Sequence, residues 1–225
     1  MNRWLRALAG GLAGSVVIGV AGCGAIGGAV KAASDGAPTD AQITAAMKGA
    51  TSVHVTGQVT TNKQTVKMDI SLLRNGGLSG TVTAPGTPQV SVIAMNGKVW
   101  VQLSKAFLAG VGAPASACAV ECGKYLQLTG AQASQMTSDL TMADITKPVS
   151  EGLAGLTYAG KTTVNGQPAF KYTGPDVGTL DVAAHGKPYP LLISGGKDTI
   201  GTLVFSQWNA VAAPAAPPAS KITHP

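Results

Sequence analysis

The stretch TVKMDISL, from Thr65 to Leu72, alternates without a break between polar and apolar side chains. Its apolar residues, which would all lie on one face of an extended chain, are Val66, Met68, Ile70 and Leu72. Successive side chains of a strand point to opposite faces. The pattern therefore predicts a strand of an antiparallel sheet that has one buried and one solvated face.

The neighbouring segments extend this pattern on both sides. SVHVTGQV, which begins at Ser52, alternates in the same way, and Asn96-Gly97 forms a strong hairpin signal between QVSVIAM and KVWVQL. Residues 52–103 thus predict a meander of about five strands. Alternating segments return from Leu156 onward, with a second hairpin signal at Asn165-Gly166 and a last strand in GTLVFSQW.

Helical patterns interrupt the strands at two places. Thr39-Asp40-Ala41-Gln42 has the form of a capping box and predicts a short helix over residues 40–50. In residues 129–156 the apolar side chains recur at helical intervals. We expect two short helices there, the second starting near Pro148, because the first turn of a helix tolerates proline. The predicted fold class is α+β.

The amino terminus has the layout of an export signal. Arg3 and Arg6 precede an uncharged apolar run that is shorter than a membrane-spanning helix. This run ends in Val20-Ala21-Gly22-Cys23, which resembles the lipobox of bacterial lipoproteins. The resemblance implies that residues 1–22 are removed and that Cys23 receives a diacylglycerol. An ordinary secretory signal is the competing interpretation.

The anchored chain would lie on the extracytoplasmic face of the cell membrane, since two acyl chains hold a protein there stably. The Gly/Ala-rich residues 23–38 then predict a flexible tether. A single domain is expected over residues 39–208. Residues 209–225 form a Pro/Ala-rich tail, for which we expect an extended or disordered chain.

Residues 155–162, GLTYAGKT, match the nucleotide-binding pattern G-x-x-x-x-G-K-[ST]. A working phosphate loop needs a strand before it and a helix after it. Here the match runs into the hairpin around Asn165-Gly166. We therefore interpret the match as coincidental and expect a turn between strands.

Composition and cysteine use narrow the function further. The chain carries a formal net charge of +6 without a run of Lys or Arg, and aromatic residues make up only 4%, so nucleic-acid binding is not expected. With Cys23 acylated, Cys118 and Cys122 remain as a pair in a compartment that permits disulfides. Half of a metal site is the alternative, although no His or Cys close by would complete it.

No catalytic motif is present in the sequence. His54, His185 and His224 have no acidic or nucleophilic residue close to them in sequence, and the aspartates lack calcium-loop spacing. Neither G-x-S-x-G nor H-E-x-x-H occurs. We expect a protein that is not an enzyme and that has no metal and no cofactor.

The order of these elements resembles the LppX/LprG family of actinobacterial envelope lipoproteins. The likeness is carried by the lipobox, SVHVTGQV, NGKVWVQL, VNGQPAFKYTG, GKPYPLLISG and the closing LVFSQWNAVAAPAAPP. The resemblance implies a strongly curved antiparallel sheet, a half-barrel similar to that of the Lol carriers, with short helices covering its concave face. It also implies an apolar cavity for the acyl chains of a lipid or glycolipid, and a lipid exporter of unknown identity as partner.

The leading hypothesis is therefore an anchored carrier that moves a lipid through the cell envelope. The side chains expected to line its cavity come from the strands and from the helical insert, residues 129–156: Val66, Met68, Ile70, Leu72, Val99, Val101, Met136, Leu140, Ile145 and Leu153. The alternative is a surface lipoprotein that carries nothing and acts as a scaffold or sensor. A hydrolase, the third hypothesis, lacks any nucleophile and base pair in the sequence.

Overall fold

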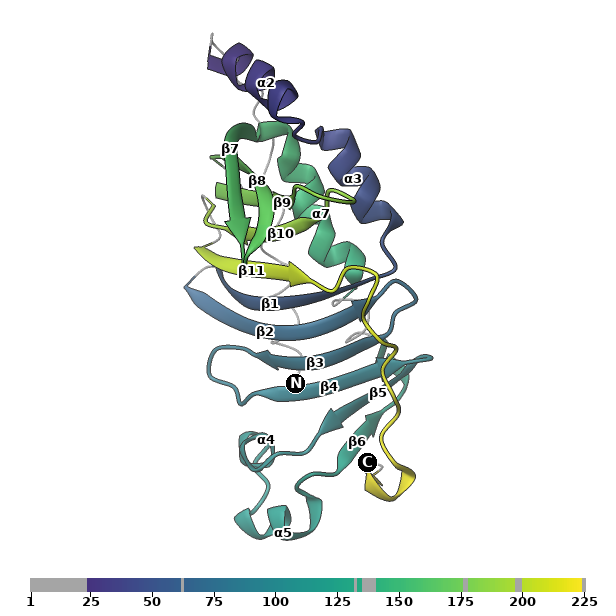
Figure 1. The fold of residues 1–225 in the computed structure, drawn as a ribbon. Helices are drawn as coiled ribbons and strands as arrows, with labels where there is room; N and C mark the ends of the chain where they lie inside the picture. Colours follow the sequence, from purple (N-terminus) through teal and green to yellow (C-terminus); the bar gives the residue numbers. More distant parts are fainter. Residues whose placement is uncertain are drawn as a thin grey trace.

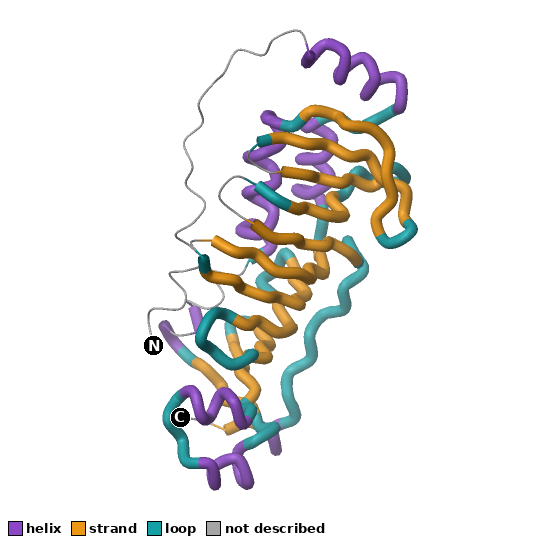
Figure 2. Tube along the Cα trace, turned by 90° about the vertical axis from the view of Figure 1, so that its left-hand side faces the viewer, coloured by secondary structure: helices purple, strands orange, loops and turns teal. Residues whose placement is uncertain are grey.

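One sheet runs through the whole molecule. In the computed structural model, which describes residues 24–61, 63–131, 133–134, 141–175, 178–196 and 200–223, twelve strands join in the order β12-β6-β5-β4-β3-β2-β1-β11-β10-β9-β8-β7. The strands are β1 Ser52–Thr61, β2 Gln64–Leu73, β3 Leu78–Thr83, β4 Val90–Met95, β5 Lys98–Gln102, β6 Tyr125–Leu128, β7 Thr157–Val164, β8 Gln167–Gly174, β9 Gly178–Ala183, β10 Pro190–Ser194, β11 Ile200–Ser206 and β12 Ile222–Thr223. The sheet is curved and does not close into a barrel (Figures 1 and 2).

The predicted meander and both predicted hairpins are confirmed. Residues 52–103 contain β1 to β5, paired antiparallel in chain order. Asn96 and Gly97, with φ of +50° and +73°, join β4 to β5, and Asn165 and Gly166, with φ of +49° and +79°, join β7 to β8. Two positive φ angles in succession match the twist of the flanking strands, which explains the preference for Asn-Gly.

Two glycines lie where neighbouring strands approach closely. Gly57 in β1 has a φ of +140°, and Gly80 in β3 has a φ of +145°. A Cβ atom would collide with the backbone carbonyl of Thr202 at the first position and of Asp69 at the second. Since glycine alone adopts such angles at low cost and leaves this space, both strands can bend while their pairing continues.

Helices α3, Asp40–Gly49, and α7, Met142–Gly152, lie side by side against the concave face of the sheet (Figure 1). The capping box predicted for α3 is confirmed. The Gln42 amide donates to Thr39 Oγ1 at 3.4 Å, and the Thr39 amide donates to Gln42 Oε1 at 2.8 Å. The other helical elements are α2 Gly24–Asp35, α4 Lys105–Gly110, η1 Ala115–Ala117, α5 Cys118–Glu121, η2 Leu153–Gly155 and η3 Ala219–Lys221.

The predicted start of α7 is wrong. The helix begins after Thr141, whose hydroxyl accepts from the Asp144 amide at 3.1 Å while the Asp144 carboxylate accepts from the Thr141 amide at 3.1 Å. This second capping box satisfies amides of the first turn, and Pro148 falls in the helix interior. The expected first helix of the insert falls on residues that are described only in part, of which 130, 131, 133 and 134 are helical.

Residues 155–162 do not form a turn, contrary to our expectation. Gly155 ends η2, and β7 starts at Thr157, so Lys161 and Thr162 lie within a strand. β7 then continues through a hairpin into β8. Because a strand and a hairpin follow this segment instead of a helix, it lacks the arrangement of a phosphate loop, as the sequence predicts.

The segment expected to be a flexible tether forms a helix over residues 24–35. Tyr158 in β7 donates its hydroxyl to Asp35 Oδ2 at 2.7 Å, and Lys161 Nζ lies 3.3 Å from Asp35 Oδ1. The Tyr158 hydrogen bond and the contact with Lys161 lower the pKa of Asp35, whereas burial and the Asp35 carboxylate raise the pKa of Tyr158 to about 12. These contacts dock α2 on the edge strand β7, which covers one end of the sheet.

The carboxy-terminal tail is extended and ordered as far as Thr223. It runs along the sheet toward β6 (Figures 1 and 2). Its last strand, β12, pairs in parallel with β6 through Ile222 opposite Tyr125 and Thr223 opposite Leu126. Helix α2 and strand β12, the first and last described elements, therefore cover the two ends of the sheet.

Candidate functional site

The apolar face predicted from the strand pattern forms the core of the molecule. Of the six strand residues proposed to line a cavity, five are buried, namely Val66, Ile70, Leu72, Val99 and Val101, while Met68 is half-buried. All of them except Val66 belong to one apolar cluster or pack against it. The same cluster continues through the other strands with Val53, Val55, Tyr158, Phe170, Tyr172, Leu180, Val182 and Phe205. The concave face is thus continuously apolar.

The proposed residues of the insert are placed only in part. Leu153 in η2 is 2% exposed and belongs to the cluster, and Ile145 packs against it from α7. Met136 and Leu140 lie outside the described residues. For these two positions the proposed contact with lipid stays a prediction.

Helices α3 and α7 form the cover of the concave face, and hydrogen bonds hold both ends of α3 to the sheet. The Tyr172 hydroxyl in β8 donates to the carbonyl of Pro38, just before the helix, at 2.6 Å. After the helix, Arg74 donates from Nε to the Ala50 carbonyl at 2.6 Å and from Nη2 to the Met47 carbonyl at 3.1 Å. Helix α3 therefore spans the concave face from β8 to the end of β2.

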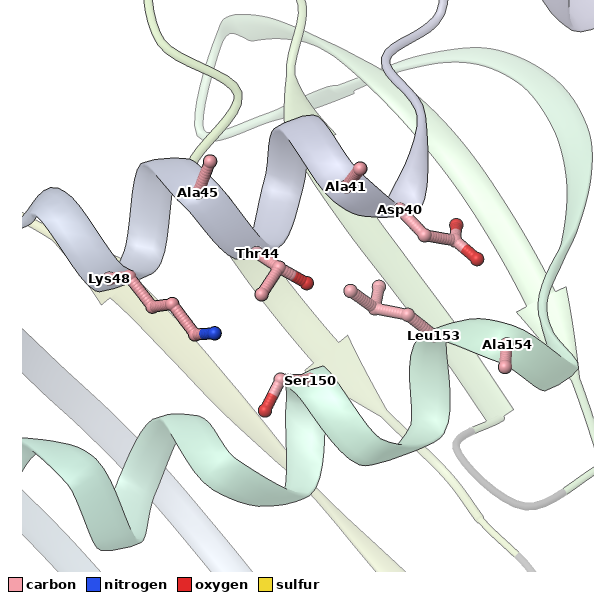
Figure 3. Close-up of a pocket in the computed structure, with 8 residues that line it drawn as sticks. All are labelled: Asp40, Ala41, Thr44, Ala45, Lys48, Ser150, Leu153 and Ala154. Atoms are coloured by element: carbon pink, nitrogen blue, oxygen red, sulfur yellow. The ribbon is translucent and has the colours of Figure 1, made fainter.

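A groove of about 380 Å³ lies between α3 and α7, and Figure 3 shows its lining. Its side chains are small or flexible: Asp40, Ala41, Thr44, Ala45, Lys48, Ser150, Leu153 and Ala154. Asp40 and Lys48 stand at its opposite ends (Figure 3). Across the groove itself, such short side chains make little apolar contact between the two helices.

The concave side chains are closed off from solvent instead of lining an open space. Ile70 and Val99 are fully buried, and Leu72 is 1% exposed. Two hollows of the described residues have volumes of about 380 and 360 Å³, and Leu153 is the one proposed cavity residue that lines either. The structure thus has an apolar layer under a helical cover in a closed arrangement.

The sheet brings His54 next to two polar residues that are distant in sequence. Its Nδ1 lies 2.9 Å from Ser71 Oγ, and its Nε2 lies 3.4 Å from Asp69 Oδ1. All three lie on the solvated face, where the Asp69 side chain is 65% exposed. β1 and β2 are each paired on both sides, so their amides cannot stabilise an oxyanion there. This arrangement gives no support to catalysis.

The predicted disulfide is confirmed. Cys118 and Cys122 are bonded, with their Cα atoms 4.6 Å apart, and they brace the turn that contains α5. Within the described ranges, no group of three or more His, Cys, Asp or Glu side chains could hold a metal ion. Among the helices of those same ranges, none has the length and apolar character to cross a membrane.

Comparison with solved structures identifies the fold. LprF from Mycobacterium bovis aligns with a TM-score of 0.53 and 17% identity over 78% of this chain and 94% of its own. The Mycobacterium tuberculosis lipoprotein LppX aligns with a TM-score of 0.47 and 17% identity over 76% of this chain and 93% of its own. No family model and no curated protein matches the sequence. The resemblance drawn from the sequence is confirmed for the architecture: the chain has the curved, helix-covered sheet fold of the LppX/LprG-like lipoproteins.

Proposed function

We propose that this chain is an envelope lipoprotein, anchored through acylated Cys23 on the extracytoplasmic face of the membrane. In this proposal it binds acyl chains of a lipid or glycolipid against the concave face of its sheet and helps to carry the lipid through the cell envelope. The observation that carries the proposal is the continuous apolar layer under a helical cover. The lipobox at Val20-Ala21-Gly22-Cys23 and the fold shared with LprF support the lipid anchor and the location.

The driving force would be the burial of apolar surface. Each acyl methylene that leaves water gains about 0.8 kcal/mol. Leu72, Val99 and Val101 offer an aliphatic surface without polar groups, against which a fatty tail loses no hydrogen bond. The burial of a long acyl chain would therefore offset the free energy that is needed to separate part of the helical cover from the sheet.

The groove between α3 and α7 is the proposed route of access. Its lining of Ala, Thr and Ser side chains allows the helices to part without breaking a large apolar contact. The hydrogen bonds of Tyr172 and Arg74 hold only the ends of α3 to the sheet. A binding step that widens the groove would thus leave these hydrogen bonds in place.

Native mass spectrometry tests the proposal most simply. The full chain with Cys23→Ala cannot be acylated at this position. When it is purified from its own host, a fraction of the molecules should carry the additional mass of a bound lipid. Met68→Trp would fill space on the concave face and should lower that fraction, whereas Lys67→Trp, on the opposite face of the same strand, should leave it unchanged. Recovery of ligand-free protein alone would contradict carriage.

A second candidate is supported by the closed packing. Ile70 and Val99 have no exposed surface, which also suits a solid core in a scaffold or sensor that carries no lipid. This candidate expects ligand-free protein in the same experiment. It also expects a partner protein to be recovered by crosslinking at the cell surface.

A further inference from the structure

A second hollow of about 360 Å³ lies away from the helices, where several strands end. The hairpin at Asn165, the turn from His185 to Lys187 and the end of β11 converge on it. We call it the strand-end crevice. Its lining consists of Val164, Asn165, Gln167, Ala183, His185, Lys187, Tyr189, Leu191, Phe205, Ser206, Gln207 and Trp208.

The floor of the crevice is apolar and largely aromatic. Trp208 stacks on Tyr189 with ring centroids 4.7 Å apart and planes inclined by 7°. Phe205 also stacks on Trp208, with centroids 6.0 Å apart and planes inclined by 17°. The Trp208 indole donates to the Pro190 carbonyl at 2.8 Å, which fixes the ring in place. Leu191 is also buried in this floor. The floor is therefore rigid and water-repelling.

The rim is held by a hydrogen-bonded turn after β11. The side chain of Asn209 accepts from the Thr51 amide at 2.7 Å and donates to the Tyr189 hydroxyl at 2.6 Å. Gln207 has a φ of +50°, in the left-handed region that side chains other than glycine rarely adopt. Such a conformation persists only where the surrounding contacts impose it. The fold thus holds this rim in one strained arrangement.

The rim carries hydrogen-bond donors and no acid. Within the described residues, its polar side chains make no hydrogen bond or ion pair: Asn165, Gln167, His185, Lys187, Ser206 and Gln207. No Asp or Glu lines the hollow. One fixed cation and several amide and hydroxyl donors around an apolar floor form an environment that favours an oxyanion.

We propose that the strand-end crevice binds a phosphate group. Lys187 and His185 contact the anion from one turn, the amides of Asn165, Gln167 and Gln207 donate to its remaining oxygens, and an attached apolar group lies on the Tyr189 and Trp208 floor. Lysine is a common phosphate ligand, and a tetrahedral anion has oxygens enough to accept from several donors. The phosphate can belong to a lipid headgroup or to a small phosphate ester. The proposal does not depend on acyl binding beneath the helices.

The test uses the full chain with Cys23→Ala, labelled with ¹⁵N, and follows the indole N–H signal of Trp208 by NMR. Inorganic phosphate, glycerol 3-phosphate and dihexanoyl phosphatidylglycerol are titrated separately. Saturable shifts with any of them support the site. Shifts with the lipid alone identify a headgroup that needs its apolar part, and equal shifts with free phosphate identify a small anion as sufficient.

Two variants distinguish specific binding in the crevice from nonspecific attraction of the anion to surface lysines. Lys187→Ala should lower the affinity about tenfold, since it removes one charge-assisted hydrogen bond. Lys98→Ala removes another exposed lysine, beside the Asn96-Gly97 hairpin, and should have no effect. Equal losses in both variants, or no saturable shift with any probe, would overturn the proposal. Binding of a phosphate-free fatty acid should be unaffected by Lys187→Ala, which keeps this test distinct from that of the proposed function.

Discussion

The groove between α3 and α7 and the strand-end crevice have nearly the same volume, about 380 and 360 Å³, yet they are built from different materials. Small aliphatic and hydroxyl side chains of two helices line the groove, with Asp40 and Lys48 at its ends (Figure 3). Stacked aromatic rings form the floor of the crevice, and its rim is fastened through Asn209.

This difference suggests two kinds of binding. A groove lined by short side chains can widen, and so it suits a long, flexible chain that must reach the core. A floor of stacked rings with a hydrogen-bonded rim keeps its shape, and so it suits a compact, polar group. One molecule can therefore combine an adjustable apolar site and a rigid polar one.

The largest expected effect comes from clamping the groove. Thr44 and Ser150 stand on opposite helices (Figure 3), and Thr44→Cys with Ser150→Cys allows a short bismaleimide to join them in the Cys23→Ala chain. If the groove must widen, the rate of fatty-acid uptake should fall at least about tenfold, which corresponds to 1.4 kcal/mol of added barrier. Stopped-flow fluorescence with a labelled fatty acid measures this rate.

The single-cysteine variants treated with the same reagent serve as controls, and phosphate binding in the crevice should not change. Unaltered uptake in the clamped protein would show that the groove is not the route of access.

An intermediate effect is expected when the rim of the crevice is released. Asn209→Ala removes the bonds to Thr51 and Tyr189 and leaves their polar groups without this partner. The free energy of unfolding should fall by about 1–2 kcal/mol, since the bond to Thr51 is exposed and the bond to Tyr189 is partly buried. Urea denaturation measures the loss. Fatty-acid uptake through the groove should persist, and its parallel loss would argue that the two regions are coupled.

The smallest effect is expected at Asp181, in the strand β9 that leads to the crevice. Its side chain is 5% exposed, and one carboxylate oxygen has no hydrogen-bond partner among the described residues. Burial raises the pKa of Asp181, while the nearby Lys171 opposes the rise. The folded state therefore holds the proton more tightly than the unfolded chain. The free energy of unfolding falls as the pH rises from the pKa of Asp181 in the unfolded chain through its pKa in the folded protein.

Asp181→Asn should remove this decline and raise the free energy of unfolding at neutral pH by about 1 kcal/mol or less. Thermal unfolding between pH 3 and pH 7 measures the slope. A variant with an unchanged slope would show that the carboxylate of Asp181 is ionised at no cost in the folded protein.

Most of the sheet could be predicted because its information is local. The alternation from Val66 to Leu72 identifies the inward face, and Asn-Gly pairs locate two turns, since both depend on neighbours in the chain. Helix α7 shows the limit, because two helix-start signals compete there. Thr141 with Asp144 determines the start, and Pro148 is tolerated inside the helix.

The parts that could not be predicted depend on contacts between distant segments. The composition of residues 24–35 favours flexibility, yet Asp35 meets Tyr158 across 123 positions of sequence. The crevice gathers residues from five strands, β7 to β11, and from the turns beside them, so no single segment carries its pattern. His54 likewise meets Ser71 and Asp69 only through strand register.

Photolabelling tests the central claim most directly. The Cys23→Ala chain is loaded with a long-chain fatty acid that carries a diazirine near its methyl end. The complex is irradiated, and peptide mass spectrometry locates the adducts. The account predicts adducts on concave residues of β2 and β5 and on α7, around Met68, Val101 and Ile145. Adducts confined to the outer face or the strand-end crevice, or saturable labelling nowhere in the chain, would contradict it.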